Sequence, residues 1–157
     1  MSAVAERADV AAGTAYVHYD SKDELLIATY AEIKWQLAAA AVAGLDRAAS
    51  LEEQFLQLWH DAYQHLADDP ARARYIIQME ASPYAEAAHR RVMERQDPLV
   101  EASAEMARYV VDLPPMVVWD LGFGPAIRLV AHPDRELDET GLDTLARACL
   151  RAVKRPD

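Results

Sequence analysis

Apolar residues recur every three or four positions along most of this chain, which is the period of an amphipathic α-helix. The first run steps from Leu25 through Ala28 to Ile33, Leu37 and Ala41. Two later stripes keep the same period: Leu51, Phe55, Leu58, Trp59, Ala62 and Leu66, then Leu142, Leu145, Ala146, Cys149, Leu150 and Val153. No segment alternates as a strand does, so the pattern predicts an all-α fold.

Capping residues divide this pattern into successive helices. Ser21-Lys22-Asp23-Glu24 and Ser50-Leu51-Glu52-Glu53 are capping boxes, in which a serine hydroxyl and a glutamate satisfy backbone N–H groups of the first turn. Asp69-Pro70, Ser82-Pro83 and Asp97-Pro98 each place a capping side chain before a proline. We therefore expect a long helix from Lys22 to about Gly44 and a new helix after each later signal.

Prolines and glycines delimit the C-terminal part. Pro114-Pro115 should open a helix that holds Met116 to Val130, and His132-Pro133 should close it. Gly124-Pro125 should bend this helix, because proline cannot donate a backbone hydrogen bond. The last two helices are expected at about 115–131 and 140–154.

Composition agrees with a soluble helical protein of 157 residues with only five glycines and 52% hydrophobic residues. No apolar run approaches the ~20 residues of a membrane span, and no secretory signal is seen. The lone Cys149 cannot form an internal disulfide, which favours the cytoplasm and a small buried side chain. The net charge of −10, with four basic against seven acidic groups in residues 1–47, argues against nucleic-acid binding.

The first thirty residues nevertheless have the spacing of a DNA-reading unit. Val4 to Ala8 forms a short helical pattern, Asp9-Val10 a tight turn, and Ala12 to Tyr19 a second short helix before the Ser21 capping box. Helix, tight turn and helix is the arrangement that places the second helix in the major groove of DNA.

The residues Val4-Ala-Glu-Arg-Ala-Asp-Val10, Gly13-Thr-Ala-Tyr16, His18-Tyr19 and Ser21-Lys-Asp-Glu-Leu-Leu26 closely resemble the helix-turn-helix signature of the TetR family. The resemblance runs without gaps over about 26 residues. It implies phosphate contacts from four residues, Thr14, Tyr16, His18 and Lys22, and positions near base edges for Ala12 and Ala15. Val10 and Tyr19 are better explained as core residues.

The chain also departs from the family pattern. Family members have a further helix before this segment, whereas this sequence starts at Met1 inside the second helix. Ala11 replaces a common capping serine or threonine, Asp9 replaces the usual glycine, and Ala12 stands where a basic or polar residue is frequent. The expectation is a parent protein that binds DNA and a polypeptide, without the first helix, that binds it weakly.

The resemblance implies two domains, a partial DNA-binding head in residues 1–47 and a ligand-binding and dimerisation domain in residues 48–157. Aromatic and sulfur-bearing residues in the second domain could be plain core or line a pocket for a small hydrophobic or aromatic effector. These are Trp59, Tyr63, Tyr75, Met79, Tyr84, Met106, Tyr109 and Trp119. The effector would release a repressor by shifting the dimer to a state in which its two heads are wrongly spaced.

The last two helices are the dimerisation pair in the family, and a reader of DNA half-sites needs a symmetric partner. The candidate dimer residues are Trp119, Gly122, Phe123, Ala126, Leu142, Leu145 and Cys149. The glycines could instead adapt their helix to the core of its own protomer.

The sequence gives little support for a catalytic function, because it contains no phosphate-binding glycine loop and no nucleophile elbow. No cofactor motif appears, and His60 and His65 have the wrong spacing to bind metal from one helical face. Asp61 and Glu80 are expected near the surface rather than as buried acids. Two other classes remain open: a helical small-molecule-binding dimer without a DNA partner, and a helical interaction protein.

Overall fold

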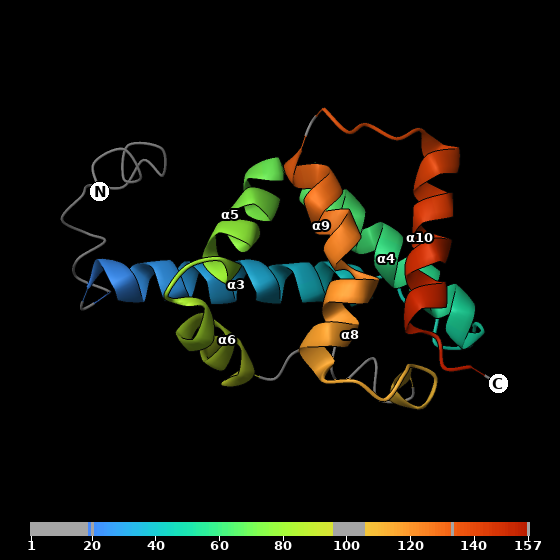
Figure 1. Cartoon of the computed structure of the whole chain (residues 1–157), viewed down its shortest axis with the longest axis horizontal. Coiled ribbons are helices and arrows are strands. Elements are labelled where there is room, and N and C mark those ends of the chain that lie inside the picture. Colours follow the sequence, from blue (N-terminus) through green and yellow to red (C-terminus); the bar gives the residue numbers. More distant parts are fainter. Residues whose placement is uncertain (1–18, 20, 96–105, 133, 157) are drawn as a thin grey trace.

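A computed structural model of the chain describes residues 19, 21–95, 106–132 and 134–156 (Figure 1). Within them lie seven α-helices, one short 3₁₀ turn and no strand, which confirms the all-α prediction. The elements are α3 (Lys22–Val42), α4 (Leu51–Ala67), α5 (Pro70–Glu80), α6 (Ala85–Met93), η1 (Met106–Arg108), α8 (Pro115–Gly122), α9 (Gly124–Ala131) and α10 (Glu139–Val153).

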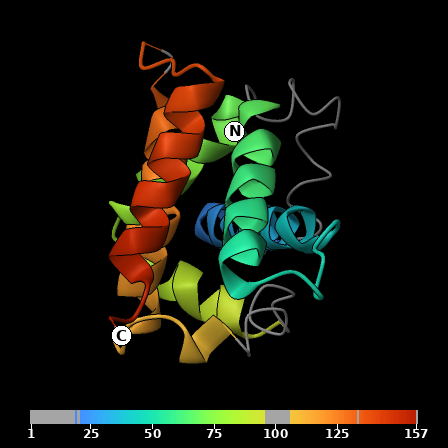
Figure 2. The same ribbon diagram turned by 90° about the vertical axis from the view of Figure 1, so that its right-hand side faces the viewer.

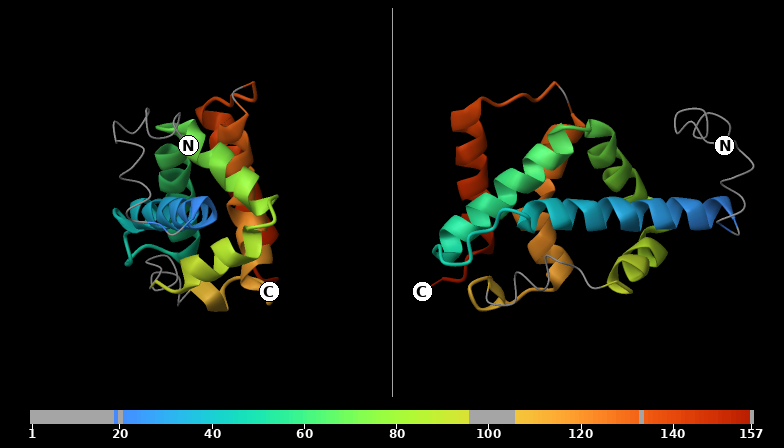
Figure 3. Two further views of the ribbon diagram at one scale, coloured as in Figure 1. Left: turned by 90° about the vertical axis from the view of Figure 1, so that its left-hand side faces the viewer. Right: turned by 180° about the vertical axis from the view of Figure 1, so that it is seen from behind.

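The long helix α3 crosses the molecule, and the other helices pack around it (Figure 1). Helices α5 and α6 flank the part of α3 nearer the N-terminus, whereas α4 packs on its C-terminal part. Seen from the side, α4 and α10 run next to each other (Figure 2), and from behind α4 and α5 meet above α3 (Figure 3). Helix α9 packs on both α4 and α5, so α3 forms one side of the bundle and α8–α10 the opposite side.

The predicted caps hold at three helix starts. The Ser21 side chain accepts from the Glu24 N–H at 3.1 Å, and Ser50 and Glu53 form the full capping box. Asp69 caps α5 with Pro70 in its first turn. Asp138, which the sequence analysis did not name as a cap, caps α10. The start at Ser82-Pro83 was predicted too early, because the Ser82 hydroxyl donates back to the Met79 carbonyl at 2.7 Å. Helix α6 therefore begins at Ala85, and Asp97-Pro98 lies outside the described residues.

The bend expected at Gly124-Pro125 divides the predicted helix into α8 and α9. The buried Trp59 of α4 reaches this junction and donates its indole N–H to the Gly122 carbonyl at 3.1 Å. A Cβ at Gly122 would lie 3.5 Å from a methyl group of Val153 in α10. This is an ordinary van der Waals distance, so Gly122 faces the core of its own protomer.

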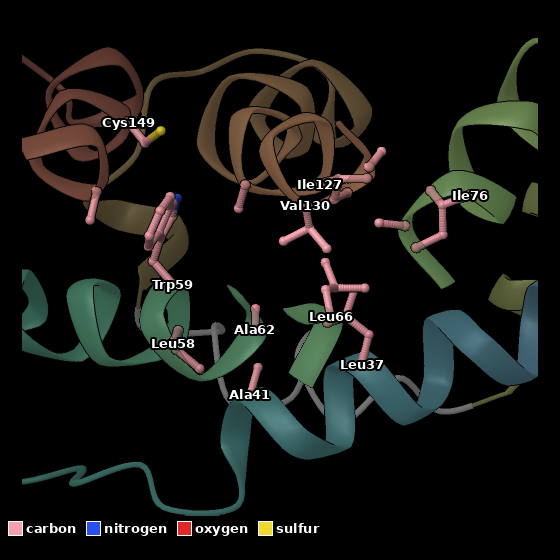
Figure 4. Close-up of a cluster of buried hydrophobic side chains, with 14 of the residues drawn as sticks. Leu37, Ala41, Leu58, Trp59, Ala62, Leu66, Ile76, Ile127, Val130 and Cys149 are labelled. Carbon is pink, nitrogen blue, oxygen red and sulfur yellow. The ribbon is translucent and has the colours of Figure 1, made fainter. Parts of the chain in front are cut away.

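One continuous core joins the helices (Figure 4). Leu37 and Ala41 of α3 meet the buried stripe of α4, while residues of α9 and α10 close the core from the opposite side. Cys149 is buried here, as predicted, and burial raises the pKa of its thiol. Because α3 contributes to the same core as α4 and α9, these helices should unfold together.

By length and composition alone, α3 would be able to cross a membrane. One such helix is weak evidence, since helices of soluble proteins pass the same test. Here Glu32 is exposed in mid-helix, and Tyr30, Leu37 and Ala41 pack in the protein core. These contacts explain the apolar face of α3 without a lipid environment.

We expect Leu66→Ala to lower the free energy of unfolding by about 2–5 kcal/mol, because it leaves a cavity in close-packed core. Leu66 is 1% exposed, whereas Met93 is 73% exposed and offers a matched control. Met93→Ala should change the unfolding free energy by less than about 0.5 kcal/mol. Urea titrations at one protein concentration measure the unfolding free energy of each variant. An equal decrease in the two variants would contradict the assignment of Leu66 to the core.

Candidate functional site

The structure describes one of the six residues proposed to contact DNA. Lys22 is exposed at the first position of α3, beside the Ser21 cap. A lysine next to free N–H groups at a helix N-terminus suits a phosphate. The other five residues, Ala12, Thr14, Ala15, Tyr16 and His18, lie outside the described residues.

Two tyrosine hydroxyls fasten the first turns of α3 to the rest of the bundle. Tyr75 of α5 donates to the Leu26 carbonyl at 2.9 Å, and Tyr84 donates to a carboxylate oxygen of Asp23 at 3.0 Å. The hydrogen bond to Asp23 raises the pKa of Tyr84. Both tyrosines were predicted as pocket residues, and the structure gives each a partner on α3. The segment that carries Lys22 is thus bonded directly to α5 and to the turn before α6.

The predicted pocket residues are distributed among several sites. Trp59 is fully buried in the core and stacks on Tyr63, with 5.8 Å between ring centroids. Met79 and Met106 are also buried. Tyr109 lies beneath the Lys154 ammonium at the C-terminal end of α10. The contacts given for these residues thus lie at several places in the fold.

An open hollow of about 620 Å³ lies between the start of α4 and α10. Its lining residues are Ser50, Leu51, Glu52, Glu53, Leu56, Tyr109 and Arg147. Arg147 pairs there with Asp143 at 2.8 Å and with Glu52 at 4.0 Å. Of the predicted pocket residues only Tyr109 lines it. An open hollow with ion pairs on its wall is poorly suited to an apolar effector.

A second group of polar residues lies in the interior, around Tyr30 of α3. Tyr30 is fully buried and donates its hydroxyl to Glu80 at 3.2 Å. Burial raises the pKa of Tyr30, and the negative charges of Glu80 and Asp120 raise it further. The ring of His89 meets Tyr30 edge-on, with 5.8 Å between centroids.

Sequence reasoning did not select Tyr30 or His89. A signal was present in the position of Tyr30, which falls within the apolar period of α3 and therefore needs a partner for its hydroxyl. His89 carried no comparable signal, because its neighbours are alanines and arginines that could face solvent.

Among the described residues, two buried side-chain atoms have no hydrogen-bond partner, Nε2 of His89 and Nε1 of Trp119. The Trp119 ring is held by the Lys34 ammonium, 3.6 Å from its centroid, and by Phe123, which stacks at 4.8 Å. Buried polar groups in native proteins are nearly always satisfied, so an unsatisfied one calls for an explanation. Both atoms belong to elements that pack near α3.

The candidate dimer residues are largely internal to the protomer. Gly122, Ala126 and Cys149 are buried within the protomer. Trp119, Phe123, Leu142 and Leu145 are partly buried against the core. Four exposed large apolar side chains lie instead along α8 and the loop before it: Leu113, Met116, Val117 and Leu121. Sequence periodicity did not distinguish the buried candidate residues from the exposed apolar residues of α8.

The acidic residues expected near the surface, Asp61 and Glu80, are both partly buried. Burial raises the pKa of Asp61, and Glu80 accepts the Tyr30 hydroxyl. In the part of the chain that the structure describes, no three of the His, Cys, Asp and Glu side chains are grouped as a metal ion would need.

Residues 1–29 match the family model described as bacterial regulatory proteins, tetR family. An HTH-type transcriptional regulator of Haemophilus influenzae is 24% identical over 99% of this chain and 84% of its own length. A solved TetR-family regulator from the same organism is 24% identical, with a TM-score of 0.73 over 96% of this chain and 82% of that one. A solved regulator from Marinobacter aquaeolei is 21% identical, with a TM-score of 0.72 over 98% and 83%. These structures show a shared fold.

We expect Tyr75→Phe to destabilise the chain by about 0.5–1.5 kcal/mol, because it removes one hydrogen bond to α3. Tyr84→Phe should cost less, because its bond to Asp23 is exposed. Hydrogen exchange of the backbone amides in residues 22–29 should become faster in both variants and stay unchanged in α10. Unaltered exchange at the start of α3 would show that the two hydroxyls do not fasten it.

Proposed function

We propose that the chain is a transcriptional regulator of the TetR family, a repressor whose dimer leaves operator DNA when a small hydrophobic or aromatic effector binds. The match of residues 1–29 to the family model carries this proposal. An exposed Lys22 at the start of α3, within the matched residues, supports it further. The family is one of regulators, and we propose no catalytic role.

In this proposal the head reads DNA through the short helix from Ala12 to Tyr19. Thr14, Tyr16, His18 and Lys22 bind phosphates and set the register of the head on the duplex, while Ala12 and Ala15 face base edges. The acidic chain gives little long-range attraction to DNA. Affinity therefore depends on these few local contacts.

Helix α3 is the proposed connection between effector and head. Its first turns are bonded to Tyr75 and Tyr84, and its later turns pack in the core with α4. An effector that favours a different packing of α5 and α6 would change the direction of the first turns. The spacing of the two heads would then no longer fit the operator.

We retain the proposed division into a head, residues 1–47, and a regulatory domain, residues 48–157, with α3 as the helix that both share. The core contacts of Leu37 and Ala41 favour grouping the later turns of α3 with the regulatory domain. A cytoplasmic location belongs to the same proposal, since that is where bacterial DNA is reached.

The proposed dimer uses the exposed apolar row on α8. Leu113, Val117 and Leu121 are spaced by four residues, and Met116 lies beside them. Contiguous exposed apolar surface commonly marks a protein–protein interface. Helix α10 packs beside α8 and can extend the surface. A twofold axis here would pair two heads, as half-site reading requires.

The alternative is a helical small-molecule-binding dimer without DNA binding. The net charge of −10 favours it, because phosphate binding needs local positive charge. This alternative does not explain why residues 1–29 match the family model of DNA-binding regulators. Selection of duplexes from a random library separates the two functions: a regulator enriches a common sequence, and a ligand-binding dimer enriches none.

We expect Lys22→Ala to weaken binding to the selected duplex and to reduce the salt dependence of binding by about one phosphate contact. Ala15→Glu should abolish binding, because it places a carboxylate beside the bases. Arg151→Ala, an exposed change in α10, is the matched control and should leave affinity unchanged. Polarisation titrations at several salt concentrations measure all three, and full affinity in Ala15→Glu would refute the proposed reading helix.

We expect the unsubstituted chain to sediment as a dimer and the Leu121→Glu variant as a monomer, because the variant would bury a charge in the proposed interface. Leu137→Glu changes a leucine of similar exposure outside α8 and should remain dimeric. Sedimentation velocity distinguishes the species. If the Leu121→Glu variant is a dimer, or the unsubstituted chain is a monomer at micromolar concentration, the α8 surface is not the dimer interface.

A further inference from the structure

A histidine and an arginine hold the turn at which α4 and α5 meet (Figure 3). His65, in the last turn of α4, and Arg72, in the first turn of α5, are both half-buried. A guanidinium nitrogen of Arg72 lies 3.1 Å from Nε2 of His65 and donates to the His65 carbonyl at 3.3 Å. Only Asp68 and Asp69 separate the two helices along the chain, so these contacts help to set the angle at which α5 leaves α4.

The chemistry of the arginine decides the protonation state of the histidine. A guanidinium group only donates hydrogen bonds and does not lose its proton in proteins. Nε2 of His65 must therefore accept, which requires a neutral ring with its proton on Nδ1. When the ring takes up a second proton, Nε2 becomes a donor, and two positive groups face each other across 3.1 Å. The hydrogen bond between the two side chains cannot persist after this change.

The surroundings of the pair also oppose a charged ring. Burial lowers the pKa of His65 below its ordinary value of 6.5, and the positive charge of Arg72 lowers it further. The carboxylates of Asp68 and Asp69 act in the opposite direction but do not outweigh these two effects. Asp69 also lies 3.6 Å from Nε of Arg72. This carboxylate gives the guanidinium a second partner, so Arg72 can release His65 and still be paired.

The helices α3, α9 and α10 also pack against α4 and carry charged side chains. On α3 and α10 these side chains make ion pairs of their own, such as Glu32 with Arg95 at 2.9 Å and Arg147 with Asp143 at 2.8 Å. Arg128, the one charged residue in the sequence of α9, is exposed. On α4 itself, Asp61 lies one turn before the histidine. The charges that act on the histidine come from α5 and from the turn before it.

Helix α5 connects this turn to the long helix α3. Arg72 and Tyr75 are three residues apart, so they lie on the same side of α5 in successive turns. The Tyr75 hydroxyl donates to the Leu26 carbonyl of α3 at 2.9 Å, and Glu80, the last residue of α5, accepts from Tyr30. A change in the direction of α5 therefore reaches the first turns of α3.

We propose that His65 and Arg72 form a proton-operated latch between α4 and α5. The neutral ring closes the latch, and protonation of the ring opens it and loosens the hold of α5 on the first turns of α3. This inference goes beyond the proposed function, because the latch acts within one protomer and needs neither effector nor DNA. Its stabilising effect is complete above pH 6.5 and is lost as the pH falls below this value, through the pKa of His65 in the folded chain.

The first experiment follows the imidazole nitrogen signals of the full chain by NMR from about pH 8 to about pH 5. At the upper end His65 should carry its proton on Nδ1. The Arg72→Met variant should raise the pKa of His65, because it removes the facing positive charge. Arg74→Met changes an exposed arginine of the same helix and should leave that pKa unchanged. A proton on Nε2 at about pH 8, or an unchanged pKa in Arg72→Met, would overturn the proposed pairing.

The second experiment compares thermal unfolding of the unsubstituted chain with that of His65→Gln. Glutamine offers an acceptor oxygen to Arg72 but does not titrate. Between about pH 7 and about pH 5, the melting temperature of the unsubstituted chain should fall by about 2–4 °C more than that of the variant. His132→Gln, which changes an exposed histidine, is the matched control and should behave as the unsubstituted chain does. An equal fall in the unsubstituted chain and in His65→Gln would show that no latch opens.

The connection to α3 has its own measurement. In the unsubstituted chain, the backbone amide signals of residues 22–29 should shift with the same midpoint as the His65 ring. In His65→Gln this midpoint should be absent, and in His132→Gln it should remain. If the ring titrates and these amide signals do not follow it, the latch does not reach α3, and that part of the proposal is wrong.

Discussion

The packing of α3 is the constraint on which the rest of the structure depends. This one helix presents Leu37 and Ala41 to the core that α4, α9 and α10 complete, and it presents Tyr30 to Glu80 and His89. Close-packed interiors do not deform smoothly, so a helix held on several sides has few alternative positions. A shift at one neighbour must therefore appear as a movement of the whole helix, including its exposed first turn.

Three tyrosine hydroxyls make hydrogen bonds between this helix and its neighbours. Tyr75 and Tyr84 bond its first turns, and Tyr30 bonds outward from its middle to α5. Apolar burial stabilises the bundle but tolerates small rotations, whereas hydrogen bonds of about 3 Å fix the relative position of two helices. Nε2 of His89 and Nε1 of Trp119, which have no hydrogen-bond partner, lie near the same helix. The surrounding packing and hydrogen bonds offset the free-energy cost of burying them.

The apolar surface of α8 shows why a stripe of hydrophobic residues is ambiguous. Gly122 and Ala126 turn inward, where Trp59 and Val153 meet the α8–α9 junction, and Val117 and Leu121 turn outward. Both sets satisfy the same helical period. Only the position of α4 and α10 shows which set is covered within the protomer and which remains exposed.

From the sequence, helical periodicity and capping chemistry were enough to place α3, α4, α5 and α10, because both act between residues a few positions apart. The same local logic placed the break at Gly124-Pro125 and identified the helix-turn-helix signature in the first thirty residues. It could not pair Tyr30 with His89, Tyr75 with Leu26 or Trp119 with Lys34, since these partners come from different helices. Such contacts arise from the angles at which helices cross, and those angles follow from the packing of every side chain in the core at once.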